Sequence, residues 1–224
     1  MKKWEFTGEE KVEAGIRLKR IRAKIGFALK CGITIETGEI GGWIEKEENM
    51  SGDAWVSGNA WVYDNARVSG NAWVSDNARV SDNAWVSGDA WVSGNARVYD
   101  NARVSDNAWV YDNARVSGNA RVSGNAWVSG NARVYGDARV SGNAHFFQIG
   151  PAGSRNDYTT FTRDKNGAIY VKCGCFYGTI KEFREKVKQT HGDNKYAKVY
   201  LAAADLAEMQ IDTTPIEDEP PKEV

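Results

Sequence analysis

The chain has 224 residues, a formal net charge of −1 and three cysteines. A net charge so close to zero gives no general attraction to nucleic acid or to membrane surfaces, so we expect neither as a partner. Three cysteines are too few for a disulfide framework, and no apolar run approaches the roughly 18 residues of a membrane span. The first residues also lack the apolar core of a signal peptide, which predicts a protein of the reducing cytoplasm.

Residues 1–40 alternate loosely between apolar and polar side chains, which predicts short β-strands. A repeat begins at about residue 41, where Trp43 and Ile44 already occupy the positions that later units give to Trp or Arg and to Val. Met50 fills the next valine position. The open end of a stacked coil exposes unpaired backbone groups, so we interpret residues 1–40 as an N-terminal β cap.

The repeat over residues 41–146 is regular from Asp53 onward, as a six-residue phrase Val-Ser/Tyr-Gly/Asp-Asn/Asp-Ala-Trp/Arg. Ala and Val are two residues apart, so in an extended chain they point to one side and the Trp or Arg between them points to the other. Gly, Asp and Asn tolerate positive φ and let the chain turn. A strand this short buries no face alone, so successive units must stack as a solenoid.

Outward side chains sort by an 18-residue period, which indicates that three units make one turn of a triangular coil with turns about 4.8 Å apart. One file of side chains, which we name the tryptophan column, contains Trp55, Trp73, Trp91, Trp109 and Trp127, and His145 follows it. The second file begins with Trp61 and continues as the arginine column, Arg79, Arg97, Arg115 and Arg133. The third contains Arg67, Trp85, Arg103, Arg121 and Arg139.

Residues 147–211 leave the repeat and predict a small ββαα unit. Two β-rich runs, 158–162 and 168–171, flank Asn166-Gly167, a strong hairpin signal. Thr179 and Glu182 have the spacing of a capping box at the start of a first helix. A second helix is predicted from helical spacing of its apolar residues, which are Tyr196, Val199, Tyr200, Ala203 and Leu206. The acidic, proline-rich tail, residues 212–224, is predicted to be disordered.

The fixed spacing of Ala and Val over nearly half the chain resembles the hexapeptide-repeat family. The resemblance implies a single-stranded, left-handed parallel β-helix, and the chain is predicted to be mainly β. Gly-Gly-Trp-Ile at 41–44 and the segments GPAGSRND, CGCFYGT and THGDNKYA also look similar to uncharacterised phage and prophage repeat proteins. That similarity implies a phage or prophage origin in a bacterial host cell and implies no activity.

Few residues of the chain support an enzymatic activity. Acyltransferases of the hexapeptide class need a general-base histidine and substrate loops, whereas this repeat has no insertion, and His145 lies at its last unit. A zinc site of several histidines is not available, because the chain has only His145 and His191. Cys173 and Cys175 with His191 remain open as metal ligands, although packing of the two thiols on one strand face is the preferred interpretation. We predict no catalytic residue, no metal and no cofactor.

The tryptophan column is the main candidate site. A bare strip of five indoles would exceed the few hundred Å² of apolar patch that a soluble monomer usually exposes, so something should cover it. The cover is either the chain itself, as the C-terminal unit or as a homodimer or homotrimer, or a foreign protein. We therefore predict a non-enzymatic scaffold or protein-binding module, with inhibition of a host factor as one form. The alternative is an acyltransferase-like enzyme with its site at a subunit interface.

The arginine column is the secondary binding candidate, since regularly spaced guanidinium groups can follow a phosphate chain. Nine aspartates lie in the same repeat, most of them at corners beside arginine-bearing strands. Surface Arg–Asp networks are the simpler expectation, and nucleic acid is not the predicted partner. The asparagines at nearly every corner are expected to hydrogen-bond to one another from turn to turn.

Overall fold

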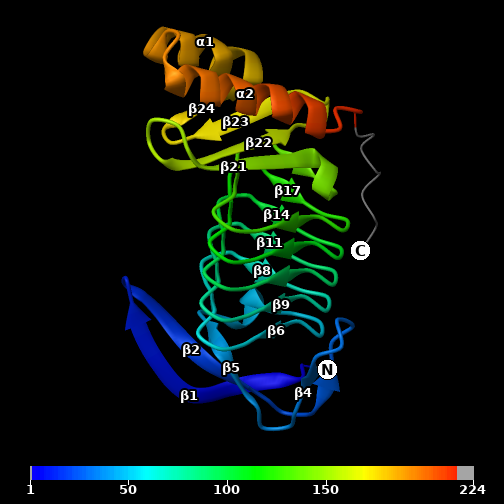
Figure 1. The fold of residues 1–224 in the computed structure, drawn as a ribbon. Helices are drawn as coiled ribbons and strands as arrows, with labels where there is room; N and C mark the ends of the chain where they lie inside the picture. The colour runs from blue at the N-terminus through cyan, green and yellow to red at the C-terminus, as the bar shows by residue number, and fades with distance from the viewer. Residues whose placement is uncertain (1, 216–224) are drawn as a thin grey trace. The chain divides into compact units, whose positions relative to one another are not determined.

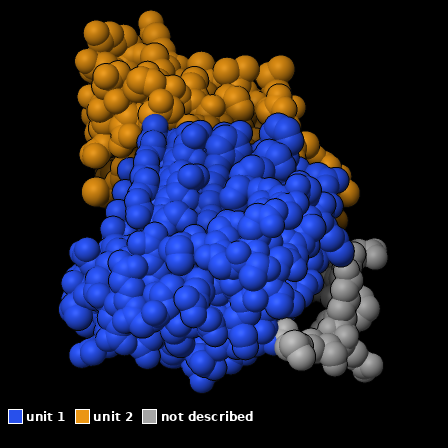
Figure 2. Space-filling model, turned by 90° about the horizontal axis from the view of Figure 1, so that it is seen from below, with its two compact units in different colours: residues 1–136 blue, residues 137–224 orange. Residues whose placement is uncertain are grey.

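The structure is a computed structural model that describes residues 2–215 and divides into two compact units, residues 1–136 and 137–224 (Figure 2). The first unit contains the N-terminal strands and most of the repeat, and the second contains a small α+β core. The repeat pattern predicted a boundary after residue 146, whereas the compact units divide after Gly136.

Residues 4–44 form a hairpin and a short strand that continue one sheet of the solenoid. Strands β1 (Trp4–Glu13) and β2 (Ile16–Ala23) are antiparallel, and β2 pairs with β5 (Ile40–Ile44). Strand β5 in turn runs parallel to β7 (Trp61–Val62), with Trp43 opposite Trp61. The predicted positions of Trp43 and Ile44 in the repeat are therefore confirmed. The loop between β2 and β5 holds the short pair β3 (Phe27–Ala28) and β4 (Thr34–Ile35), and the 3-10 turn η1 (Glu47–Asn49) follows β5.

The repeat forms parallel sheets in which each strand pairs with the strand 18 residues further along the chain (Figure 1). The first sheet continues from β7 through β10 (Arg79–Val80), β13 (Arg97–Val98), β16 (Arg115–Val116) and β19 (Arg133–Val134). The second contains β8 (Arg67–Val68), β11 (Trp85–Val86), β14 (Arg103–Val104) and β17 (Arg121–Val122). The third contains β6 (Trp55–Val56), β9 (Trp73–Val74), β12 (Trp91–Val92), β15 (Trp109–Val110) and β18 (Trp127–Val128). The first unit is thus a β-solenoid of about five turns.

The interior of the solenoid consists of the repeated Ala and Val side chains, which are fully buried from Ala54 to Val134. The corners between strands are made by residues with positive φ, which are Gly or Asp in every case from Gly52 to Gly136. At Gly94, for example, φ is 67°, and a Cβ there would lie 2.9 Å from the backbone of Asp112 on the next turn. Small inward residues and left-handed corners therefore fix the coil, and the outward residues are left free to vary.

The second unit is built on a four-stranded antiparallel sheet, ordered β21 (Phe146–Ala152), β22 (Asp157–Arg163), β23 (Ile169–Cys173) and β24 (Phe176–Thr179). Before it lie the strand β20 (Arg139–Val140) and the 3-10 turn η2 (Asn143–His145). Helices α1 (Ile180–His191) and α2 (Lys195–Gln210) cover one face of the sheet (Figure 1). The prediction of a ββαα unit was therefore wrong, because two strands were missed: β21 contains Pro151, and β24 is four residues long with a central glycine.

The two predicted helices are present, but one buries a different face from the one expected. Thr179 and Glu182 form the predicted capping box, with the Glu182 N–H donating to Thr179 Oγ1 at 3.3 Å and the Thr179 N–H donating to Glu182 Oε2 at 2.7 Å. In α2 the side chains of Val199 and Leu206 are exposed instead of buried. The buried face is formed by small residues and one tyrosine, namely Ala197, Tyr200, Ala203, Ala204 and Ala207, which fit closely against the sheet.

The first residues of the predicted disordered tail are ordered. Nη1 of Arg163 donates to the backbone carbonyls of Asp212 and Thr214, and the Asp212 N–H donates to the carbonyl of Ala144. Burial lowers the pKa of Arg163, and Asp212 and Asp164 oppose this shift. The hydrogen bonds from the buried Arg163 guanidinium therefore hold residues 212–214 in place, despite the polar composition of the tail. Residues 216–224 lie outside the described part of the chain.

Candidate functional site

The tryptophan column lies on one sheet of the solenoid, with its residues directly opposite one another. Trp55 pairs with Trp73, Trp73 with Trp91, Trp91 with Trp109 and Trp109 with Trp127. Ring centroids of successive residues from Trp73 to Trp127 lie 4.6, 4.8 and 5.2 Å apart. These separations are the range in which aromatic pairs attract each other. The 18-residue sorting of the sequence therefore corresponds to real contacts between side chains.

Trp55 does not belong to the accessible part of the column. Its side chain is fully buried, and the ring of Phe27 packs edge-on against it with centroids 5.8 Å apart. Lys3 in turn lies over Phe27, with Nζ 4.8 Å from the ring centroid. The prediction of Trp55 as a binding residue is corrected accordingly, because the N-terminal segment covers it. The accessible residues are Trp73, Trp91 and Trp109, which are half-buried, and Trp127, which is 50% exposed.

The stack of rings is uneven, and a groove opens where it changes. Trp73 and Trp91 are nearly parallel at 29°, and Trp109 and Trp127 are parallel at 10°, but Trp91 and Trp109 meet at 63°. Between that middle pair lies a groove of about 250 Å³ lined by Trp91, Ser93, Trp109 and Tyr111, which we name the indole groove. Its walls are mostly apolar, so it suits a ligand with an apolar surface.

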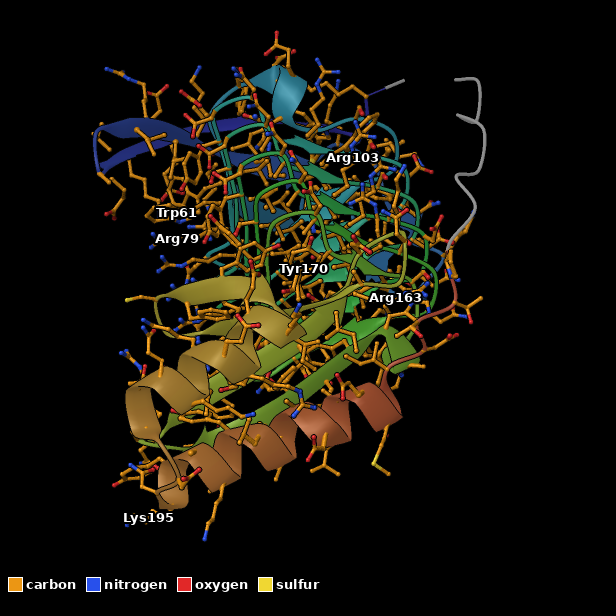
Figure 3. All side chains as sticks on the ribbon, turned by 90° about the horizontal axis from the view of Figure 1, so that it is seen from above. Trp61, Arg79, Arg103, Arg163, Tyr170 and Lys195 are labelled. Atoms are coloured by element: carbon orange, nitrogen blue, oxygen red, sulfur yellow. The ribbon has the colours of Figure 1, made fainter. Side chains whose placement is uncertain are left out.

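The arginine column lies on the sheet that includes β10, β13, β16 and β19. Arg79 pairs with Arg97, Arg97 with Arg115 and Arg115 with Arg133. The guanidinium of Arg79 lies 4.1 Å from the ring centroid of Trp61, its neighbour on the preceding turn (Figure 3). Arg103 lies over Trp85 in the same way at 5.5 Å. Such cation–π contacts were missed from the sequence, although the 18-residue spacing of Trp and Arg is the signal that predicts them.

The predicted Arg–Asp networks were wrong for the central turns. Within the described residues, Arg67, Arg79, Arg97, Arg103, Arg115 and Arg121 form no ion pair with a carboxylate. The corner aspartates instead accept hydrogen bonds from the backbone of the next turn. Oδ2 of Asp76 accepts from the Gly94 N–H at 2.9 Å, and Oδ2 of Asp112 accepts from the Gly130 N–H at 3.1 Å. These carboxylates therefore stabilise the coil and leave the arginines facing solvent.

The corner asparagines form ladders from turn to turn, as predicted. Asn65 donates to Asn83 at 3.4 Å, and Asn83 donates to Asn101 at the same distance. Asn107 donates to Asn125 at 3.2 Å. Asn83 thus both accepts and donates along the solenoid, so these residues are explained by the fold and supply no separate site.

His145 lies in the second unit, in a short turn. Its Nδ1 accepts from the Ser141 N–H at 3.1 Å and lies 2.9 Å from Ser141 Oγ, and its Nε2 is 4.0 Å from Asp212. Burial and then the nearby Arg163 lower the pKa of His145, while Asp212 raises it. Although Ser141, His145 and Asp212 lie close together in space, as in a Ser-His-Asp triad, Nδ1 of His145 already accepts from a backbone N–H. The imidazole therefore closes a turn, and its geometry does not favour a general base.

Cys173, Cys175 and His191 line one cleft of the second unit, with a volume of about 330 Å³. Cys173 Sγ accepts from the Thr159 hydroxyl at 3.2 Å, and His191 stacks on the ring of Tyr200. Across the described residues, no group of three or more His, Cys, Asp or Glu side chains is arranged to hold a metal ion. The three side chains share a cleft without the clustering that a metal requires.

The fold and the outward side chains together define the class of protein: the chain is a β-solenoid repeat protein with a tryptophan-rich face. The family model described as YdcK Beta solenoid repeat matches residues 60–76, 72–88, 78–94, 90–106, 96–112, 114–130 and 128–145. A comparison with curated proteins finds no match. Among the described residues, no helix is both long and apolar enough to cross a membrane.

Proposed function

We propose that this protein is a non-enzymatic binding module and that the exposed part of the tryptophan column, Trp73, Trp91, Trp109 and Trp127, contacts a partner protein. The observation that supports the proposal most directly is the indole groove, where two stacked pairs of rings meet at an open angle. Aromatic side chains on a rigid scaffold bind with little loss of conformational entropy and are common among the residues that dominate interface energies. A half-buried row of indoles on an otherwise polar coil is suited to binding a protein partner.

Acyl transfer is the weaker alternative for this chain. It requires a histidine with an accessible nitrogen beside a substrate pocket. His145 uses Nδ1 to accept from the Ser141 N–H. The second histidine, His191, has its ring stacked on Tyr200, with Nε2 3.5 Å from the Ser154 hydroxyl. The chemistry available to these two residues favours a structural role over acid–base catalysis.

The proposal includes a left-handed, triangular coil with residues 1–40 as its cap, an assembly built through the tryptophan face, and an origin in phage or prophage. The support for handedness and origin is the resemblance of the repeat and of the segments that flank it to such proteins. A partner from the bacterial host, inhibited by binding, is the specific form of this proposal. A second copy of the chain on the same face, as a dimer or trimer, is the other form.

The test is recovery of a partner from bacterial lysate by the full chain and by a Trp91→Ser/Trp109→Ser variant, with Trp85→Ser as the matched control. Trp85 is also exposed but belongs to another sheet. We expect the double variant to lose the partner, or to lose oligomer mass in light scattering, while the control keeps both. Equal recovery and equal mass for all three proteins would contradict a role for this face.

A further inference from the structure

The indole groove contains hydrogen-bonding atoms that the repeat elsewhere satisfies internally. Nε1 of Trp73 donates to Ser57 Oγ at 2.8 Å, and Nε1 of Trp91 donates to Ser75 Oγ at 3.4 Å, in each case sixteen residues earlier in the chain. The same contact recurs on another sheet, where Trp85 donates to Ser69 at 3.1 Å. An indole and the serine of the preceding turn therefore normally satisfy each other.

Among the tryptophans with a serine sixteen residues earlier, the exception is Trp109, whose equivalent serine is Ser93. Trp55 has no such serine, and its buried Nε1 also lacks a partner within the described residues. Within the described residues, Nε1 of Trp109, Oγ of Ser93 and the hydroxyl of Tyr111 have no hydrogen-bond partner, and all three residues line the indole groove. The indole N–H is a donor only, and each of the two hydroxyls can donate as well as accept. No carboxylate, amide or basic side chain lines the groove. It therefore offers aromatic walls and donors, and it suits a ligand with apolar surface and acceptors.

Proline-rich backbone has that chemistry, because proline has no N–H and presents only a carbonyl acceptor beside an apolar ring. Extended proline-rich segments in the polyproline II conformation bind aromatic-lined grooves elsewhere in this way. A carbohydrate, the other common ligand of stacked aromatic rings, presents hydroxyl donors as well. The side chains that line the groove offer few acceptors for those donors, namely the hydroxyls of Ser93 and Tyr111, whereas the carbonyls of a proline-rich backbone need only donors.

Charge and spacing beside the groove specify the ligand further. Asp76 and Asp112 are exposed at the corner that follows the tryptophan strands, two 18-residue turns apart. Each uses Oδ2 for the backbone of the next turn, and within the described residues neither has a basic partner. Two turns span about 9.6 Å at about 4.8 Å per turn. One turn of polyproline II, three residues at about 3.1 Å each, spans about 9.3 Å.

From these observations we infer that the indole groove binds a proline-rich segment in the polyproline II conformation with basic side chains three residues apart. Prolines pack against Trp91 and Trp109, and the Trp109 indole and the Tyr111 hydroxyl donate to their carbonyls. Asp76 and Asp112 pair with successive basic side chains. This inference rests on the proposed function, since it names the kind of partner that the tryptophan face takes.

The test is isothermal titration of the full chain with a peptide of four Pro-Pro-Arg repeats. Three comparison ligands separate the sources of affinity: Gly-Ser-Arg repeats keep the charge without proline, Pro-Pro-Glu repeats reverse the charge, and a β-linked glucose hexamer tests carbohydrate. We expect the Pro-Pro-Arg peptide to bind at least about tenfold more tightly than each of the others. Equal binding of the Gly-Ser-Arg peptide, or tighter binding of the glucose hexamer, would overturn the inference.

Substitutions assign the binding to the groove. We expect Trp109→Phe, which keeps a ring and removes the N–H, to weaken the Pro-Pro-Arg peptide about threefold to tenfold, because it removes a single donor. Trp85→Phe, the matched change on another sheet, should leave the affinity within about twofold. An unchanged affinity for Trp109→Phe would contradict the assigned donor.

Paired acidic substitutions test the spacing of the charges. Asp76→Asn/Asp112→Asn keeps the acceptor and the tolerance of positive φ while removing both charges. We expect it to weaken the peptide about threefold to tenfold at low salt, with a smaller effect at high salt. The control is Asp82→Asn/Asp100→Asn, at the corner that does not adjoin the tryptophan sheet, and it should bind like the wild type. If the Pro-Pro-Arg peptide fails to bind while lysate recovery still depends on Trp91 and Trp109, this inference fails and the binding module stands.

Discussion

The tryptophan column and the arginine column belong to the same coil and share the same interior. Behind each outward residue lie a buried Ala and a buried Val, and each strand is followed by a left-handed corner of Gly or Asp. The two columns differ only in the side chains that face outward. Rings of the tryptophan column attract their neighbours at 4.6 to 5.2 Å, whereas the arginines that pair in register carry like charges. The inward residues therefore determine the fold, and the outward residues carry the information about binding.

Substitution of the interior should have the largest effect and should not distinguish the two columns. Val92 lies behind the tryptophan column and Val98 behind the arginine column, and both are fully buried. We expect Val92→Ala and Val98→Ala each to lower the free energy of unfolding by about 2–3 kcal/mol, because each leaves a cavity between turns. Urea denaturation followed by circular dichroism measures the effect. A difference of more than about 1 kcal/mol between the two variants would contradict a shared interior.

Outward substitutions should distinguish the columns. Trp91 contacts rings on both sides, so Trp91→Ser should lower the free energy of unfolding by about 2 kcal/mol. Arg97 is exposed and, within the described residues, has no ion pair, so Arg97→Ser should change it by less than about 0.5 kcal/mol. The same denaturation experiment compares them. Equal losses at the two positions would contradict this difference between the columns.

Substitutions at Asp100 test whether a corner that follows the arginine column requires a residue that tolerates positive φ and supplies an acceptor. Asp100 has a φ of 59°, and its Oδ2 accepts from the Gly118 N–H at 3.0 Å. Asp100→Asn keeps both properties and should change the free energy of unfolding by less than about 0.5 kcal/mol. Asp100→Val loses both and should lower it by about 1–2 kcal/mol. If the valine variant is as stable as the asparagine variant, the corner does not depend on the side chain at this position.

The repeat was predictable because one weak local pattern recurs with the same period throughout residues 53–146. Each unit alone is a two-residue strand, but the 18-residue sorting of outward residues fixes which strands pair, and hence which rings touch. The burial of Trp55 under Phe27 was not predictable, because that contact occurs once and follows no period. The same holds for Arg163 and the carbonyls of Asp212 and Thr214. The indole groove combines both cases: its residues follow the repeat, but the 63° angle between Trp91 and Trp109 does not.

In the sequence, the position 18 residues after Trp127 is His145, which lies in the 3-10 turn η2 of the second unit. Burial and Arg163 lower the pKa of His145 in the folded state, and Nδ1 accepts from the Ser141 N–H only while unprotonated. In the unfolded chain the pKa of His145 is about 6.5, so the unfolded state binds a proton at this side chain more readily than the folded state does. Stability contributed by neutral His145 is present above about pH 6.5 and is lost as the pH falls below it, so the free energy of unfolding should rise with pH up to about 6.5. Helical circular dichroism reports this unit, since α1 and α2 both lie in it, and His145→Asn keeps an acceptor for Ser141 without the titration. If the free energy of unfolding depends on pH as steeply in His145→Asn as in the wild type, the pH dependence belongs to another group.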